Sequence, residues 1–172
     1  MKRELMDRVE PSYIGGGTIV DVDTDDYALD EGPARFEAGT PAIADVIGLG
    51  AAVDYLNKIG IQNVENHEKD LSGQMRDGLE EIQGVLTYGP EHEKTIALLC
   101  FNVDGLLPRD LALALEKSAR IMVRAGHHCA LPLIKSIAGK TGTARASAYF
   151  YNTKEEIERL VDEVKKIARV RK

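Results

Sequence analysis

The run Arg124-Ala125-Gly126-His127-His128-Cys129-Ala130-Leu131-Pro132 carries the most specific local pattern in the chain. It follows the apolar residues 121–123, which predict a short buried strand, and it precedes a weakly helical segment. Gly126 permits sharp backbone geometry, so Cys129 is expected on a turn between two packed elements. Two imidazoles and one guanidinium lie within the five residues before this cysteine. A thiol reacts as its thiolate, and neighbouring cations favour the thiolate form.

A second extended segment, residues 143–147, carries Arg145, sixteen positions after Cys129. A guanidinium grips a carboxylate with two parallel hydrogen bonds, so a thiol and an arginine together favour chemistry on a small acid. Two alternatives stay open for Cys129. An isolated cysteine is often a small core residue. A metal site is disfavoured, because consecutive residues rarely aim their donors at one ion and His67 and His92 are isolated.

Composition limits the classes of protein that this chain can represent. Its 172 residues are enough for one ordinary domain, and 44% hydrophobic residues are typical of a globular protein. The net charge of −6 argues against a nucleic-acid partner, and no apolar run or signal pattern predicts a membrane span or export. Cys100 and Cys129 suggest no disulfide framework, and we expect Cys100 in the core. A reducing cytoplasm is the expected location.

Helical and strand periodicities alternate along the chain and predict an α+β layer, in which one sheet is covered by helices. The expected strands are residues 18–22, 85–88, 95–103, 121–123 and 143–150. The expected helices are residues 41–59, 61–83, 108–119 and a last one that begins after a capping box at residues 153–156. Residues 2–9 predict one or two helical turns, and residues 33–39 predict an extended segment.

The helix expected at residues 41–59 begins with Thr40 as N-cap and Pro41 at its first position, and its apolar residues predict a wide buried face. The spacing disfavours two ligand motifs. Gly139-Lys140-Thr141 has Ile134 where a phosphate-binding loop needs glycine, and the aspartates of residues 21–26 lack the glycine and glutamate of a calcium loop.

Residues 123–132, followed by Arg145-Ala146-Ser147 and Tyr151-Asn152-Thr153, resemble the C-terminal part of a group II cysteine desulfurase. These are fold-type I, pyridoxal-phosphate (PLP) enzymes of the class V aminotransferase family. Residues 35–41 (RFEAGTP) and 47–56 (IGLGAAVDYL) resemble the same family in the same order. The resemblance implies a remnant of the PLP-binding large domain at 1–40, a linking helix at 41–60 and, at 61–172, the C-terminal small domain, an antiparallel-type sheet covered by helices.

The resemblance also implies roles for seven residues. Cys129 matches the nucleophile that takes sulfur from PLP-bound L-cysteine as a persulfide, with release of alanine. Arg145 matches the arginine that binds the substrate carboxylate. The remaining matches are Arg124 for substrate binding, His127 and His128 for tuning and holding the cysteine, and Gly39 and Thr40, the latter reaching the cofactor phosphate across a dimer. An acceptor or scaffold protein would then collect the sulfur for iron–sulfur cluster assembly.

Family members link PLP through the lysine of a His-Lys pair, and these 172 residues contain no such pair. PLP supplies the electron sink of the reaction, so the chain is expected to be inactive alone and to need a complementary PLP-binding half or subunit. Selenocysteine lyase activity is compatible with the same pattern. Two other hypotheses remain: a persulfide carrier that accepts sulfur on Cys129, and a non-catalytic dimerisation or scaffold module.

Overall fold

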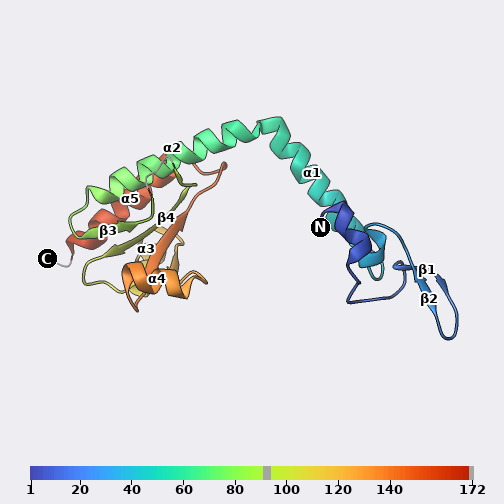
Figure 1. Cartoon of the computed structure of the whole chain (residues 1–172). Coiled ribbons are helices and arrows are strands. Elements are labelled where there is room, and N and C mark those ends of the chain that lie inside the picture. Colours follow the sequence, from blue (N-terminus) through green and yellow to red (C-terminus); the bar gives the residue numbers. More distant parts are fainter. Residues whose placement is uncertain (91–93, 171–172) are drawn as a thin grey trace. The chain divides into compact units, whose positions relative to one another are not determined.

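The computed structural model describes residues 1–90 and 94–170. The chain divides into two compact units, Met1–Lys58 and Ile59–Lys172 (Figure 1). The first unit contains the 3-10 helices η1 (Arg3–Arg8) and η2 (Ala34–Phe36), and the antiparallel hairpin of β1 (Ile19–Val22) and β2 (Tyr27–Leu29). The extended segment predicted for residues 33–39 is therefore wrong in its middle, where η2 forms.

The helix α1 (Ile43–Ile59) differs from its prediction in two respects. It begins at Ile43, so Thr40 and Pro41 precede the helix and Thr40 is not its N-cap. None of its residues is buried, and its large apolar side chains are exposed, among them Ile43, Val46, Ile47, Leu49 and Val53. The predicted buried face is wrong for this structure, because periodicity shows that a helix has an apolar side but not which neighbour covers it.

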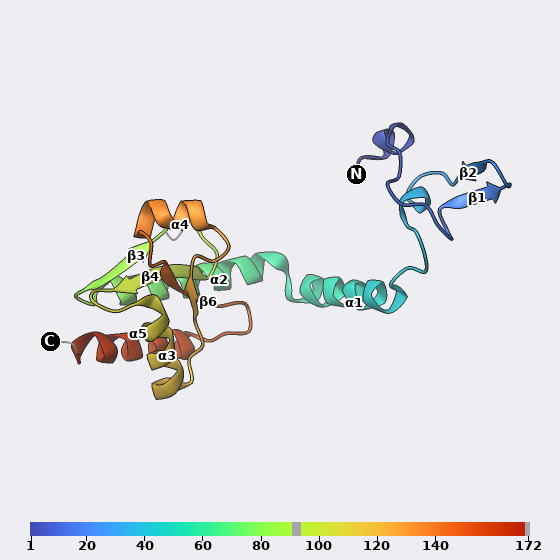
Figure 2. The ribbon, with the colours of Figure 1, turned by 90° about the horizontal axis from the view of Figure 1, so that it is seen from below.

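The second unit consists of one sheet and four helices along its described residues. The helices are α2 (Ile61–Glu80), α3 (Pro108–Ala119), α4 (Leu131–Ala138) and α5 (Lys154–Arg169), with α1 contributing its last residue. The strands are β3 (Val85–Tyr88), β4 (Leu98–Val103), β5 (Arg124–Gly126) and β6 (Thr143–Ser147), in the order β3-β4-β6-β5 with all neighbours antiparallel. The predicted α+β fold with an antiparallel sheet covered by helices is confirmed (Figures 1 and 2).

The two faces of the sheet differ in burial, as the alternation along β4 shows. Leu99, Phe101 and Val103 are buried, and they form the core with residues from α2, α3 and α5. The intervening residues Leu98, Cys100 and Asn102 are only half-buried and lie on the opposite face. The placement of Cys100 in the core is therefore wrong, because its position in the pleat is shifted by one residue from the buried set.

The strand predicted at residues 121–123 is also wrong. Arg120 adopts a left-handed conformation (φ 56°) that ends α3, and the chain then runs irregularly until β5 begins at Arg124. Two further strands are shorter than predicted, since β4 begins at Leu98 and β6 ends at Ser147. Because β5 begins three residues later than predicted, Arg124 belongs to the sheet. Its backbone pairing with β6 positions its side chain relative to the turn that follows.

The predicted bounds of α3 and the predicted start of α5 are confirmed, whereas the predicted end of α2 is not. The helix α3 has the predicted bounds, and α5 begins with the predicted capping box, in which Thr153 accepts from the Glu156 amide and the Glu156 carboxylate accepts from the Thr153 amide. The helix α2 ends at Glu80, three residues earlier than expected.

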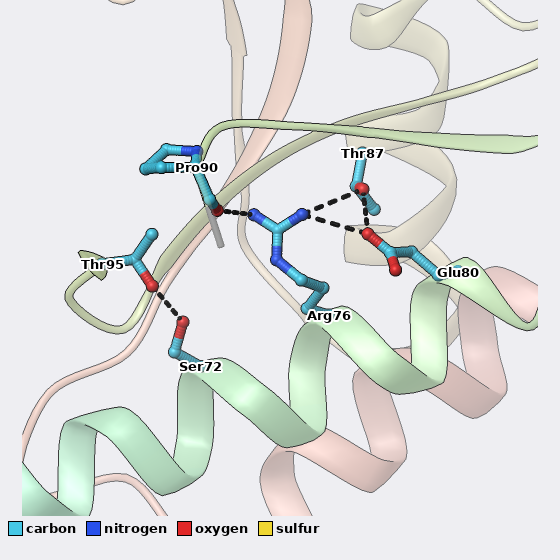
Figure 3. Close-up of polar contacts among 6 residues, drawn as sticks. All are labelled: Ser72, Arg76, Glu80, Thr87, Pro90 and Thr95. Atoms are coloured by element: carbon cyan, nitrogen blue, oxygen red, sulfur yellow. Dashed lines mark hydrogen bonds and ion pairs between the residues drawn. The ribbon is translucent and has the colours of Figure 1, made fainter. Parts of the chain in front are cut away.

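Polar contacts fasten the β3–β4 hairpin to α2 (Figure 3). Arg76 donates to the Glu80 carboxylate over 3.0 Å and to the carbonyl of Pro90 over 2.9 Å, and Thr87 donates to Glu80 over 2.6 Å. The Thr87 hydroxyl, together with Arg76, lowers the pKa of Glu80, so this carboxylate stays charged. These contacts help to fix the hairpin on which Cys100 lies.

Candidate functional site

The turn after β5 holds the cysteine in a backbone conformation that few residues adopt. His128 and Cys129 have φ angles of 53° and 61°, and both are non-glycine residues in the left-handed region. Such a residue costs about 1–3 kcal/mol, and the conformation persists only where the surroundings impose it. The amide of Ala130 donates to the carbonyl of His127 over 2.8 Å and closes the turn. Cys129 lies on a turn, as expected, and it is an exposed free thiol.

Arg124 contacts the sulfur directly. Its Nη2 donates a hydrogen bond to the Sγ of Cys129 over 3.3 Å. The planar guanidinium presents its donors in a fixed geometry, so this contact helps to hold the Cys129 side chain in place. The alternative of a buried core cysteine is therefore wrong for Cys129.

The sheet register places Arg145 on the same face as Arg124. The two residues are Cα partners in the antiparallel pair of β5 and β6, and directly opposite residues project to the same side. Arg145 is half-buried, and its buried Nε has no hydrogen-bond partner within the described residues. Cys100 is the partner of Arg145 in β4, so the second thiol also lies on this face. A guanidinium with a donor that has no partner within the described residues is suited to hold an anionic group.

The two histidines of the turn are held by the segment that leads into β6. The Nε2 of His128 lies 2.8 Å from the hydroxyl oxygen of the buried Thr143, and the Nε2 of His127 lies 3.1 Å from the carbonyl of Lys140. Burial lowers the pKa of His128, and the nearby charge of Arg145 lowers it further. His128 is therefore neutral at physiological pH, and it contributes no positive charge to the site.

The seven residues singled out from the sequence fall into two groups. Cys129, Arg124, Arg145, His127 and His128 belong to the second unit, where β5, β6 and the turn between β5 and α4 bring them together. Gly39 and Thr40 belong to the first unit and are exposed. Gly39 has a φ of 89°, and its amide donates to the carbonyl of Gly16 over 2.7 Å.

The sequence does not predict the residues that hold the turn through hydrogen bonds. Thr143 contacts the His128 ring, and the side-chain amide of Asn102 donates to the carbonyl of Gly142 over 3.1 Å. Gly142 lies against the backbone of Gly126, where an added Cβ would come within 2.6 Å of the carbonyl oxygen. The signal that could reveal Thr143 and Gly142 is the pairing of the two extended segments, because it places Thr143 opposite Gly126, at the start of the cysteine turn.

The described residues contain no group of three or more histidine, cysteine, aspartate or glutamate side chains placed to hold a metal ion. Within the same part of the chain, no helix combines the length and apolar character needed to cross a bilayer.

Comparison with known proteins identifies the family to which this architecture is similar. The sequence profile of the family described as Aminotransferase class-V matches residues 1–160. A probable cysteine desulfurase of Methanothermobacter thermautotrophicus is 41% identical over 167 residues, which cover 96% of this chain and 42% of that protein. A probable cysteine desulfurase of Pyrococcus abyssi is 46% identical over 159 residues, which cover 92% of this chain and 39% of that protein.

Solved structures show the same likeness in three dimensions. The apo cysteine desulfurase of Thermococcus onnurineus superposes with a TM-score of 0.92 at 44% identity, covering 98% of this chain and 42% of that one. The Escherichia coli cysteine desulfurase CsdA, in an S-sulfonic acid form, gives a TM-score of 0.88 at 33% identity, covering 98% of this chain and 41% of that one. The chain thus spans about two fifths of the length of the relatives that it matches.

Proposed function

Because this chain belongs to the class-V aminotransferase family, we propose that its residues form the C-terminal part of a PLP-dependent cysteine desulfurase. In this function Cys129 receives sulfur from L-cysteine as a persulfide. The observation that carries the proposal is the exposed Cys129 sulfur, 3.3 Å from the Arg124 guanidinium, on a turn beside Arg145. The names of the relatives at 41–46% identity agree with it.

The donor set of the chain fits a part of a PLP site. The Thr40 hydroxyl and the backbone of Gly39 are groups that bind a phosphate, and Gly39 has the positive φ that brings a backbone close to a ligand. A His-Lys pair, which would supply the lysine for the cofactor aldehyde, does not occur in the 172 residues. We therefore expect cofactor binding only together with the PLP-binding half of such an enzyme. When bound, PLP supplies the electron sink that weakens the carbon–sulfur bond of the substrate.

Two side chains of the second unit carry out the transfer in this proposal. Arg145 binds the carboxylate of L-cysteine through its guanidinium, whose Nε is buried and lacks a partner within the described residues. The Cys129 thiolate attacks the substrate sulfur, so a sulfur–sulfur bond forms as the carbon–sulfur bond breaks. The electron pair of the broken bond stays with the substrate carbon, which takes up a proton and leaves as alanine. Arg124 holds the Cys129 sulfur throughout.

The same proposal includes the assembly and the later fate of the sulfur. Residues 1–40 are a remnant of the large domain, residues 41–60 link it to the small domain, and residues 61–172 form that small domain. The enzyme is a cytoplasmic homodimer in which Thr40 serves the partner's cofactor phosphate. An acceptor or scaffold protein takes the persulfide sulfur for iron–sulfur cluster assembly, and selenocysteine is a second candidate substrate.

The decisive experiment combines the chain with the PLP-binding N-terminal half of the Methanothermobacter relative. With L-cysteine, the complex should release alanine and should add one sulfur atom, about 32 Da, to Cys129, measured by mass spectrometry of the peptides. The Cys129→Ala chain should do neither, whereas Cys100→Ala is the matched control and should do both. A stable, PLP-loaded complex that releases no alanine contradicts the proposal.

The exposure of Cys129 also favours a second candidate function, a persulfide carrier that is loaded by another enzyme. The chain incubated alone with a soluble persulfide donor would then carry an added sulfur at Cys129 and pass it to an acceptor thiol. The exposed apolar side chains of α1 favour a third candidate, a non-catalytic dimerisation or scaffold module. Light scattering that shows only a monomer contradicts that third function.

A further inference from the structure

We propose that Thr143 is a positioning residue for the nucleophile: its buried hydroxyl holds His128, and through His128 it holds the left-handed turn that presents Cys129. This inference rests on the proposed function for its meaning in catalysis. It concerns a residue that touches neither the sulfur nor any expected substrate atom. Its action passes through one hydrogen bond, 2.8 Å from the Thr143 Oγ1 to the His128 Nε2.

The turn needs an external constraint, since its own backbone does not favour the observed conformation. His128 and Cys129 are consecutive non-glycine residues with positive φ, whereas such geometry is usually left to glycine. The hydrogen bond from Ala130 to His127 closes the turn but leaves the orientation of the His128 ring undetermined. The contact with Thr143 determines that orientation, because Thr143 lies in β6 and is fully buried.

Thr143 can serve as a fixed point because its surroundings are rigid. It pairs with Gly126 in the sheet ladder, and the preceding Gly142 leaves no space for a side chain against the Gly126 backbone. Asn102, from the neighbouring β4, holds the carbonyl of Gly142 over 3.1 Å. On the other side of the turn, His127 contacts the Lys140 carbonyl. The segment Lys140 to Thr143 therefore contacts both histidines that precede the cysteine.

The test compares Thr143→Val, which removes the hydroxyl at nearly constant shape, with Thr143→Ser, which keeps it. The matched control is Thr87→Val, which removes a hydroxyl from the same sheet where it contacts Arg76 and Glu80 instead of the turn (Figure 3). On the full chain, amide hydrogen exchange of Ala130 and the ring-nitrogen NMR signals of His128 report the state of the turn. In the complex with the PLP-binding half, kcat and KM for alanine release report its effect on transfer.

We expect Thr143→Val to speed exchange of the Ala130 amide about fivefold to tenfold, the factor for one net hydrogen bond, and to shift the His128 Nε2 signal. It should lower kcat by about the same factor and leave KM unchanged, because Arg145, which binds the carboxylate, is untouched. Thr143→Ser should restore the parental values, and Thr87→Val should leave them unaltered.

Three outcomes overturn the inference: parental exchange and kcat in Thr143→Val, a loss in Thr143→Ser as large as in Thr143→Val, or the same change in Thr87→Val. Failure of the proposed function is recognised separately. In that case the parental complex releases no alanine, whereas the exchange and NMR measurements still decide whether Thr143 holds the turn.

Discussion

Arg124 and Cys129 are five positions apart in the sequence, and the structure joins them through a hydrogen bond of 3.3 Å between Nη2 and Sγ. Arg124 is fixed by the ladder of β5, while Cys129 is fixed by the left-handed turn that follows. The chain therefore reverses so that the guanidinium at the start of the strand reaches the sulfur at the tip of the turn.

Arg124→Lys should slow the transfer of sulfur to Cys129 by about tenfold to a hundredfold, as expected for the loss of one hydrogen bond to a charged group. A lysine keeps the positive charge but not the planar, fixed donor geometry of the guanidinium. Single-turnover formation of the persulfide, in complex with the PLP-binding half, measures the rate. Arg109→Lys on the exposed surface of α3 is the control, and a parental rate in Arg124→Lys contradicts the assigned contact.

The stability of the chain should depend on pH through His128, whose pKa is lowered by burial and by the Arg145 charge. The unfolded chain binds this proton more readily than the folded one, starting near its ordinary pKa of about 6.5. The free energy of unfolding should therefore fall as the pH drops from about 6.5 through the folded pKa, and His128 should add no such dependence above that window.

Urea unfolding of the parent and of His128→Gln, measured from about pH 8 to about pH 5, isolates this contribution, since the variant lacks the titrating ring. The parent should lose stability relative to the variant on the acid side. Two curves that stay parallel over the whole range contradict the lowered pKa.

Gly142→Ala should destabilise the second unit by roughly 2–4 kcal/mol, since it combines left-handed strain with overpacking. Gly142 has a φ of 84°, and an added Cβ would lie 2.6 Å from the Gly126 carbonyl oxygen, so strand backbone must move. Gly139→Ala is the matched control, because Gly139 has a φ of 75° but open space around its Cβ position. It should cost only about 1 kcal/mol, for strain alone. Chemical denaturation measures both, and equal losses would argue against the close approach of the two strands.

Phe101→Ala should lower the free energy of unfolding by about 3–5 kcal/mol. Phe101 is fully buried on the core face of β4. Its neighbours cannot move far enough to fill the space that the ring would leave, so the substitution creates a cavity. Leu86→Ala, on the neighbouring β3 but 55% exposed on the other face, should cost less than about 1 kcal/mol. Similar losses for both variants would contradict the assignment of the two faces of the sheet.

The errors of the sequence-based prediction share one cause. The apolar residues 121–123 predict a strand, but the strand is Arg124–Gly126, since its partner β6 selects which residues enter the ladder. The apolar neighbours of Cys100 predict a core position, yet the pleat turns this residue to the half-buried face. The apolar side of α1 predicts burial, yet no residue of α1 is buried. Hydrophobicity predicts that a segment packs, not the partner that it packs against.

The sequence by itself determined the features that depend on near neighbours in the chain: the bounds of α3, the capping box of α5 and the turn after Gly126 that carries Cys129. Only the tertiary structure decided that Arg124 and Arg145 are register partners, that Thr143 contacts His128, and that Cys100 shares their face. The physical reason is the sequence separation over which each interaction acts. Backbone propensities and helix caps involve residues a few positions apart, whereas strand register is set by packing and pairing between segments that are distant in the sequence.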